Sequence, residues 1–273
     1  MKGMKIVEIF SYAFMQRAFI VGILLAIIIP CIGTVVVLKR LSMIGDALSH
    51  TSLAGIAAGL LIGINPIIGA IIFCIIAALG IEYIRKKIPK YAELSIAIIM
   101  SAGIGLAGVL SGFVKNTANF NSFLFGSIVA ISDQEMYIVV GVSIIVLLSF
   151  IFLFKELFYI SLDERSARLA GIPVRSINFI FTILTAITIS IAARTVGALI
   201  VSSMMVVPVA CGMQLGKSYK QTVIYSTIFA VIFTIIGLFL SYYQELKPGG
   251  TIVLVGVVSL LLIIFIKRIL GRS

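Results

Sequence analysis

Long apolar runs recur along this chain, separated by short polar segments. A run of about twenty apolar residues is long enough for a helix to cross the roughly 30 Å hydrocarbon layer of a membrane. The pattern therefore predicts an all-α polytopic membrane protein with about nine spans. These spans fall near residues 17–38, 42–63, 66–84, 93–112, 136–154, 176–193, 195–215, 221–241 and 250–266.

Composition agrees with this pattern, because 61% of the 273 residues are hydrophobic and only 11% are charged. These values exclude an ordinary soluble domain. The net charge of +11 does not indicate nucleic-acid binding, since the basic residues are scattered in short clusters between apolar runs. If the loops after the first, third, fifth and seventh spans and the C-terminus are cytoplasmic, they hold 15 of the 21 Lys and Arg residues. The positive-inside rule then predicts an N-out, C-in orientation.

The N-terminal residues 1–16 mix Lys2, Lys5 and Glu8 with isoleucine and phenylalanine. This mixture, with no small-residue cleavage site behind it, predicts an interfacial amphipathic segment and not a removed signal. Residues 17–273 are then expected to form a single transmembrane domain. The three cysteines lie in predicted spans without metal-binding spacing and are interpreted as small membrane-embedded residues.

The second predicted span begins with the polar run Gly45–His50, which contains the only histidine of the chain. Asp46 and His50 are four residues apart and therefore share one face of a helix. Counted from the basic pair Lys39 and Arg40 at about 1.5 Å per residue, Asp46 lies roughly 8 to 10 Å deep and His50 about 6 Å deeper. Ionisable groups at such depth usually face a bundle interior or a water-filled path. The pair suggests ligands for a divalent metal or a proton relay.

Small residues recur at intervals of four on another side of this span and predict the close approach of a second helix. They are Thr51, Gly55, Gly59 and Gly63, about 100° around the helix from the face of Asp46 and His50. The face of Asp46 and His50 itself continues through alanines 54, 57 and 58. These alanines are expected to leave room beside it.

The fourth span is rich in glycine and serine, including Gly103, Gly105 and Gly108. Such a helix suits either a moving interior element or a tight packing interface. The apolar run 123–131 is too short to cross a membrane. It is expected to form a half-helix or re-entrant segment covered by protein or water.

The inner loop 155–175 contains a predicted short helix. Ser161 and Glu164 match a capping box, Gly171 is a typical terminating residue, and Pro173 follows it. The expected result is a capped cytoplasmic helix of about ten residues. Such an element suits a subunit to which a cytoplasmic partner transmits a conformational change. It is also compatible with a surface helix that only closes the loop.

The sequence Gly216-Lys217-Ser218 resembles the end of a phosphate-binding loop. The first glycine of that motif would have to occupy position 211, which is cysteine. The segment also follows a membrane span and not a β-strand. No nucleotide site is expected in this chain, and any ATP must be handled by another subunit.

Two features of the outer and central regions have competing explanations. Thioether ligation by Met204 or Met205 is conceivable, but filling of an irregular helix interface is the favoured interpretation. Arg194, at the outer turn between the sixth and seventh spans, could pair with Asp133 or Glu135, but a position at the membrane interface is the favoured interpretation.

The segment Lys39-Arg-Leu-Ser-Met-Ile-Gly-Asp-Ala-Leu-Ser-His-Thr-Ser-Leu53 resembles the signature of the ABC-transporter permeases for zinc and manganese uptake. The resemblance extends over nearly the whole chain. It includes Phe14–Ala18, Phe125–Ser127, the inner segment 161–171, and Val196–Val201 with Pro208.

This resemblance implies a type II importer permease with a cobalamin-permease-like fold in a prokaryotic cytoplasmic membrane. Two copies would form one pathway, with a cytoplasmic ATPase subunit on each and an extracellular metal-binding receptor protein. Asp46 and His50 match the family's pair of metal ligands. No covalently bound cofactor is expected, and ATP acts only through the partner. The coupling helix that contacts the ATPase would comprise Ser161, Asp163, Glu164, Arg165, Ala167, Arg168, Leu169 and Gly171.

Three alternatives remain open from the sequence. A proton-coupled secondary transporter would use Asp46 and His50 as a relay and would need no ATPase. A permease of the same fold for cobalamin, haem or a siderophore would need a wider pathway. In a purely structural interpretation the two side chains would satisfy each other in a hydrogen bond within the helix. The transported metal, Mn²⁺, Zn²⁺ or Fe²⁺, is not determined by the sequence.

Overall fold

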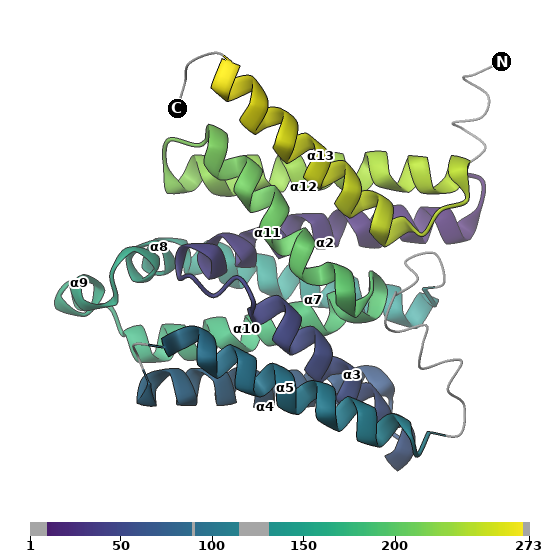
Figure 1. Cartoon of the computed structure of the whole chain (residues 1–273), viewed down its shortest axis with the longest axis horizontal. Coiled ribbons are helices and arrows are strands. Elements are labelled where there is room, and N and C mark those ends of the chain that lie inside the picture. Colours follow the sequence, from purple (N-terminus) through teal and green to yellow (C-terminus); the bar gives the residue numbers. More distant parts are fainter. Residues whose placement is uncertain (1–9, 89–90, 115–130, 270–273) are drawn as a thin grey trace.

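The computed structural model describes residues 10–88, 91–114 and 131–269, all of it helices joined by short turns (Figure 1). Two short helices, α8 and α9, project at one end of the bundle (Figure 1). The helices are α2 (Ala13–Leu38), α3 (Ile44–Ile62), α4 (Pro66–Lys87), α5 (Ala92–Ser111), α7 (Asp133–Phe152), α8 (Phe154–Leu162), α9 (Glu164–Leu169), α10 (Val174–Thr195), α11 (Ala198–Leu215), α12 (Tyr219–Gln244) and α13 (Pro248–Ile269).

Within these described residues, seven helices are long and apolar enough to cross a membrane: α2, α4, α5, α7, α10, α12 and α13. Each begins and ends within a few residues of a predicted span, which confirms a polytopic all-helical membrane protein. The nine-span count and the N-out, C-in orientation stay predictions. Most of the N-terminal segment and the expected half-helix at 123–131 lie outside the described residues.

The helices α3 and α11 coincide with predicted spans but are not among those seven. The helix α3 packs against α4, α5, α10 and α11, and α11 packs against α2, α3, α10, α12 and α13. Protein therefore surrounds both helices on several sides. A helix in this position can carry polar residues that a lipid-facing helix excludes, and α3 is the helix that carries Asp46 and His50.

The small-residue stripe of α3 is the contact surface for α4, as predicted. A Cβ atom on Gly55 would overlap the carbonyl oxygen of Gly69 and would lie 2.8 Å from the Cα of Ala70. Thr51, on the same stripe, packs against α5, where a Cβ on Gly103 would lie 2.6 Å from its Oγ1. Main-chain atoms of three helices thus approach without side chains between them.

We expect Gly55→Ala to lower the stability of the protein by about 1 to 3 kcal/mol, because the added methyl group meets main-chain atoms that cannot change rotamer. The matched control is Gly141→Ala in α7, where an added Cβ meets open space and alanine favours the helix. Thermal unfolding of the purified protein in detergent measures both variants. Equal melting temperatures for the two would contradict this packing.

The turn between α2 and α3 is short because Arg40 adopts a left-handed conformation with φ 59°. The amide of Arg40 donates to the carbonyl of Val37 at 3.0 Å, and that of Leu41 donates to Val36 at 2.9 Å. These two bonds form the Schellman arrangement that ends a helix. As a result Lys39 leaves the end of α2 next to the inner helix α9.

Two ion pairs join helices at the opposite end of the bundle, where α7 begins. Ser132 and Glu135 form a capping box at the start of α7. Glu135 also pairs with Arg194 of α10 at 2.6 Å, and Asp133 pairs with Arg17 of α2 at 2.8 Å. The predicted alternative, a pairing of Arg194 with Glu135, is therefore confirmed, and the interfacial position of Arg194 stays a prediction.

Candidate metal site and coupling helix

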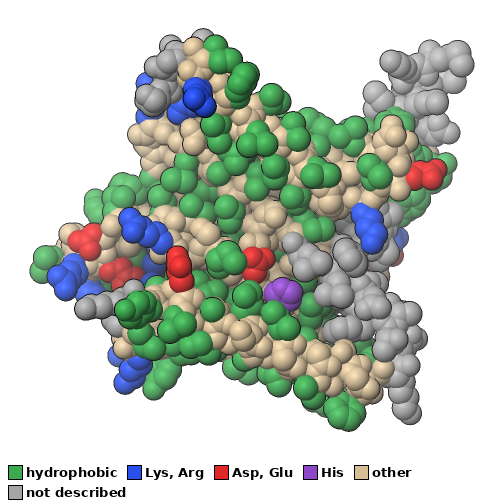
Figure 2. Space-filling view, viewed as in Figure 1, with side chains coloured by type: hydrophobic (Ala, Val, Ile, Leu, Met, Phe, Trp, Pro, Cys, Tyr) green, Lys and Arg blue, Asp and Glu red, His purple; other side chains and the backbone are tan. Residues whose placement is uncertain are grey.

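Asp46 and His50 lie in the first two turns of α3, and both side chains are partly exposed. Figure 2 shows the histidine, in purple, on the open face of the molecule. The neighbouring residues 47 to 49 are buried. The two side chains therefore occupy the one side of this part of α3 that its own chain leaves uncovered.

Contacts on either side of the pair define where it points. A Cβ atom on Gly45 would lie 3.0 Å from the Cε of Met205 and 3.1 Å from the Cα of Ser202, so this position faces α11. Thr51 faces Gly103 of α5. At about 100° per residue, Gly45 and Thr51 each lie about 100° from the nearer member of the pair. Asp46 and His50 consequently face the gap between α5 and α11.

No hydrogen bond or ion pair joins Asp46 to His50 within the part of the chain that the structure describes, and neither has another partner there. The contact required by a self-satisfied structural pair is thus missing. The described residues also hold no group of three or more His, Cys, Asp or Glu side chains that could bind a metal ion. One copy therefore offers two strong ligands, fewer than the four of a tetrahedral or the six of an octahedral site.

Ser49 lies between them in sequence and was not singled out by the sequence analysis. It is completely buried, and its Oγ has no hydrogen-bond partner in the described structure. Buried hydroxyl groups without a partner are uncommon. A serine in a helix interior gives no sequence signal of this kind.

The alanines that continue the face of Asp46 and His50 do not leave the room predicted beside them. Ala54 and Ala57 are 0% exposed and Ala58 is 8% exposed. Neighbouring helices fill this space because small residues allow close approach. Within one copy, the site is therefore open beside Asp46 and His50 and closed further along α3.

The inner helix α9 is shorter than predicted and is capped by a different residue. Asp163 is its N-cap, and its carboxylate accepts from the amides of Arg165 at 3.0 Å and Ser166 at 3.1 Å. These bonds, with one from the Ser166 hydroxyl, lower the pKa of Asp163. Ser161 instead lies in α8, where its hydroxyl donates to the carbonyl of Phe158. The predicted capping box between Ser161 and Glu164 is therefore wrong, and α9 spans six residues instead of about ten.

The end of α9 is as expected from Gly171, which has φ 80°. The amide of Gly171 donates to Arg168, and that of Ile172 donates to Ala167. Ala167 is buried, whereas Leu169 is 90% exposed. The helix thus presents an apolar side chain and two exposed arginines, Arg165 and Arg168, at the tip of the bundle.

We expect Asp163→Ala to weaken α9 by about 1 kcal/mol, the usual effect of removing an N-cap. Hydrogen exchange at the amides of Arg165 and Ser166 should become about fivefold faster. The control is Ser161→Ala, which should leave these amides unchanged. Faster exchange in the control alone would restore the predicted capping box.

Glu164 does not cap a helix. Its side chain instead connects α9 with three other segments of the chain. Its Oε1 lies 3.2 Å from the Nζ of Lys39 and 3.7 Å from Arg85, and it accepts a hydrogen bond from Asn178 at 3.1 Å. Lys39 also donates to Asn178 at 2.8 Å. We call Lys39, Arg85, Glu164 and Asn178 the inner network. It connects α9 with the α2–α3 turn, α4 and α10.

Burial disfavours the charged forms of Lys39 and Glu164 in the inner network, whereas their mutual contact favours these charged forms. Burial lowers the pKa of Lys39 below its usual value, the nearby Arg85 acts in the same direction, and Glu164 opposes both. Burial alone would raise the pKa of Glu164, but Lys39, Asn178 and Arg85 together hold it below its usual 4.5. No local sequence pattern indicates this network, since its members are up to 139 residues apart.

An all-helical bundle with membrane-crossing helices, two metal-type ligands without partners among the described residues, and a projecting inner helix is typical of a multi-pass membrane transport subunit. A model of the ABC 3 transport family matches residues 11–267, and the chain belongs to that family. It is similar to the "Probable metal transport system membrane protein" of Treponema pallidum, with 34% identity over 96% of this chain and 98% of the relative. It is also similar to the "Manganese import system permease protein ScaB" of Streptococcus parasanguinis, with 31% identity over 94% of this chain and 91% of the relative.

Solved structures show the same fold. "PsaBC from Streptococcus pneumoniae in complex with Fab" matches with a TM-score of 0.86 and 30% identity, over 96% of this chain and 95% of the other. A second match is titled "An inward-facing conformation of a putative metal-chelate type ABC transporter" and has a TM-score of 0.72 over 92% of this chain and 85% of the other. Its identity is 14%, so this second match shows the fold alone. The chain is thus a permease subunit of an ABC transporter in a bacterial cell membrane.

Proposed function

We propose that this chain is the permease of an ATP-driven importer for Mn²⁺, with Zn²⁺ as the second candidate metal. Asp46 and His50 would bind the cation transiently on its way through the membrane. ATP would be hydrolysed by a separate cytoplasmic subunit docked on α9, and an extracellular receptor protein would deliver the metal.

The observation that carries the proposal is the placement of Asp46 and His50 one turn apart on α3, partly exposed and without partners among the described residues, beside the gap between α5 and α11. A carboxylate oxygen suits Mn²⁺ and an imidazole nitrogen suits Zn²⁺, so ligand type alone does not select between them. The names of the relatives, including the manganese permeases, favour Mn²⁺.

A second copy of the chain would complete the site. One copy supplies only two strong ligands, and two copies would supply four. The helix α5 offers a surface for such a contact, because Gly105 and Gly108 are exposed with open space where their side chains would be. Small residues of this kind allow close approach between membrane helices.

The test is uptake of radiolabelled Mn²⁺ by proteoliposomes that contain the permease, its ATPase subunit and the metal receptor. We expect accumulation that requires ATP hydrolysis, is inhibited by excess unlabelled Mn²⁺ more strongly than by Zn²⁺, and is unaffected by a protonophore. Uptake by the permease alone that a protonophore abolishes would overturn the proposal in favour of proton coupling.

A further inference from the structure

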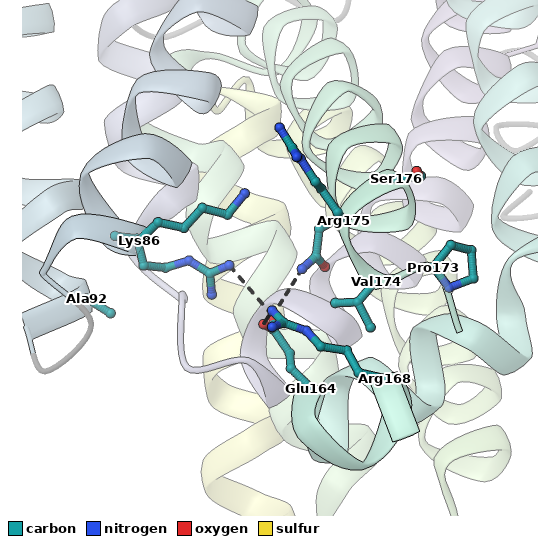
Figure 3. A pocket seen from close by; sticks show the side chains of 10 residues that line it. Lys86, Ala92, Glu164, Arg168, Pro173, Val174, Arg175 and Ser176 are labelled. Atoms are coloured by element: carbon teal, nitrogen blue, oxygen red, sulfur yellow. Dashed lines mark hydrogen bonds and ion pairs between the residues drawn. The ribbon is translucent and has the colours of Figure 1, made fainter. Parts of the chain in front are cut away.

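A basic cavity of about 780 Å³ opens between α4, α9 and α10 at the end of the bundle where α9 projects (Figure 3). Its charged lining consists of Arg85, Lys86, Arg168 and Arg175 against a single carboxylate, Glu164. In Figure 3 the ends of Lys86 and Arg175 point to the side of the cavity away from Glu164. The cavity therefore carries an excess of positive charge.

That excess is only partly neutralised by Glu82 and Glu164. Glu164 is already engaged by Lys39 and Arg85. Lys86 shares the carboxylate of Glu82 with Arg85. Arg175 has no carboxylate within ion-pair distance among the described residues. Guanidinium and ammonium groups in this arrangement suit a phosphate group, which accepts hydrogen bonds from both.

A second cavity of about 560 Å³ continues from the first and shares Lys86, Arg175 and Ser176 with it. It runs along α4 and α10 past Leu79, Phe179 and Ile180. Glu82 also lines it, with a carboxylate oxygen 3.2 Å from the Nζ of Lys86. From Lys86 to Leu79 the distance along α4 is about 10 Å toward the middle of the membrane. The two cavities together form one groove with a basic head and an apolar extension.

The apolar extension lies on the outer surface of the bundle. Phe179 is 52% exposed and Ile180 is 42% exposed, both on the membrane-crossing helix α10. Tyr83 also lines this groove. The Nζ of Lys87 lies 5.9 Å from the centroid of the Tyr83 ring. Tyrosine and lysine in such positions are typical of the boundary between headgroups and hydrocarbon.

We propose that this groove binds an anionic phospholipid, with its phosphate between Lys86 and Arg175 and an acyl chain along Leu79, Phe179 and Ile180. The lipid would join α4 to α10 beside α9 and so hold the coupling helix at its junction. The apolar extension favours a lipid over a contact with the soluble ATPase subunit, which does not reach membrane-crossing surfaces. The proposal takes from the proposed function only that the α9 end is cytoplasmic.

The test measures lipids that remain bound to the full-length permease after extraction from nanodiscs of mixed phosphatidylglycerol and phosphatidylcholine, by native mass spectrometry, without metal or ATP. We expect selective retention of phosphatidylglycerol by the wild type. The double variant Lys86→Gln/Arg175→Gln should bind it at least about tenfold more weakly, because two cations near the phosphate are removed. The matched control Lys217→Gln/Arg268→Gln removes two exposed cations outside both cavities and should retain the lipid as the wild type does.

Three results would overturn the proposal. The first is equal retention of phosphatidylglycerol by the two double variants. The second is equal retention of the two lipids by the wild type, which would indicate an apolar surface without headgroup recognition. The third is displacement of the lipid by soluble glycerol phosphate. If the first result comes together with loss of copurification of the ATPase with the cavity variant, the cavity is a subunit contact instead. None of these results depends on metal uptake, so failure of the proposed transport function remains distinguishable.

Discussion

Replacing Asp46 or His50 by alanine is expected to reduce ATP-dependent Mn²⁺ uptake by more than about tenfold, while the protein stays folded. Loss of an outer-shell partner already lowers metal affinity by roughly 10-fold to 100-fold, and a direct ligand matters more. Folding should survive, because both side chains are partly exposed and have no partners among the described residues. Uptake into proteoliposomes and thermal unfolding measure the two effects separately.

The conservative variant Asp46→Asn sharpens this test. It keeps the size of the side chain but removes the charge that attracts a cation, so we expect it to behave like Asp46→Ala. The matched control is Leu61→Ala, which shortens another exposed side chain of α3 and should transport at nearly the wild-type rate. Normal uptake by both Asp46→Ala and His50→Ala would remove the proposed metal site.

The second large effect is expected at Glu164. Glu164→Gln removes the negative charge that pairs with the buried ammonium group of Lys39, whose side chain is only 7% exposed. Breaking a buried ion pair leaves one charge uncompensated and costs several kcal/mol, whereas the partial exposure of Glu164 reduces this effect. We expect a loss of about 1 to 3 kcal/mol in stability, together with fewer Mn²⁺ ions transported per ATP hydrolysed.

A double-mutant cycle separates this pairing from a general loss of charge. Lys39→Met alone should be milder, because Glu164 keeps Arg85 and Asn178. The double variant Lys39→Met/Glu164→Gln should be more stable than Glu164→Gln. The control Glu93→Gln removes an exposed carboxylate in the first turn of α5. If Glu164→Gln matches this control in stability and in transport, the inner network has no role in coupling.

The lowered pKa of Glu164 also determines the direction in which the stability of the protein changes with pH. A carboxyl group whose pKa is lower in the folded state stabilises the protein above its ordinary pKa of 4.5. That contribution is lost as the pH falls through the lower folded value. The inner network should therefore be intact at neutral pH, and Glu164→Gln should flatten the acid side of the stability profile.

The helices were predictable from the chain because membrane-crossing segments need a strong local signal, a long apolar run. The small residues on α3 likewise predicted the close approach of a second helix, but not that this helix is α4. Side-chain partners were less predictable. Asp163 and Ser161 are both good N-cap residues two positions apart, and only the backbone path decides which one caps α9.

The geometry of the candidate site was predictable only in part. Spacing placed Asp46 and His50 on one face of a helix, but their exposure depends on how α5 and α11 pack beside α3. The surroundings of the alanines beyond them were likewise not predictable, since a small residue is equally compatible with an open space and with a close contact. The inner network depends on contacts between four segments that no local pattern connects.

The contacts that α11 makes with α2 and α3 have a mechanical consequence. A Cβ on Gly33 of α2 would lie 2.6 Å from the carbonyl oxygen of Met205, and a Cβ on Gly45 of α3 would lie 3.1 Å from the Cα of Ser202 in the same helix. Main-chain contacts leave no rotamer change to absorb a displacement, so packed elements of this kind move as units. Any shift of the α2–α3 turn that moves Asp46 should therefore displace the part of α11 around Ser202 and Met205, and with it the segments of α12 and α13 that pack against α11.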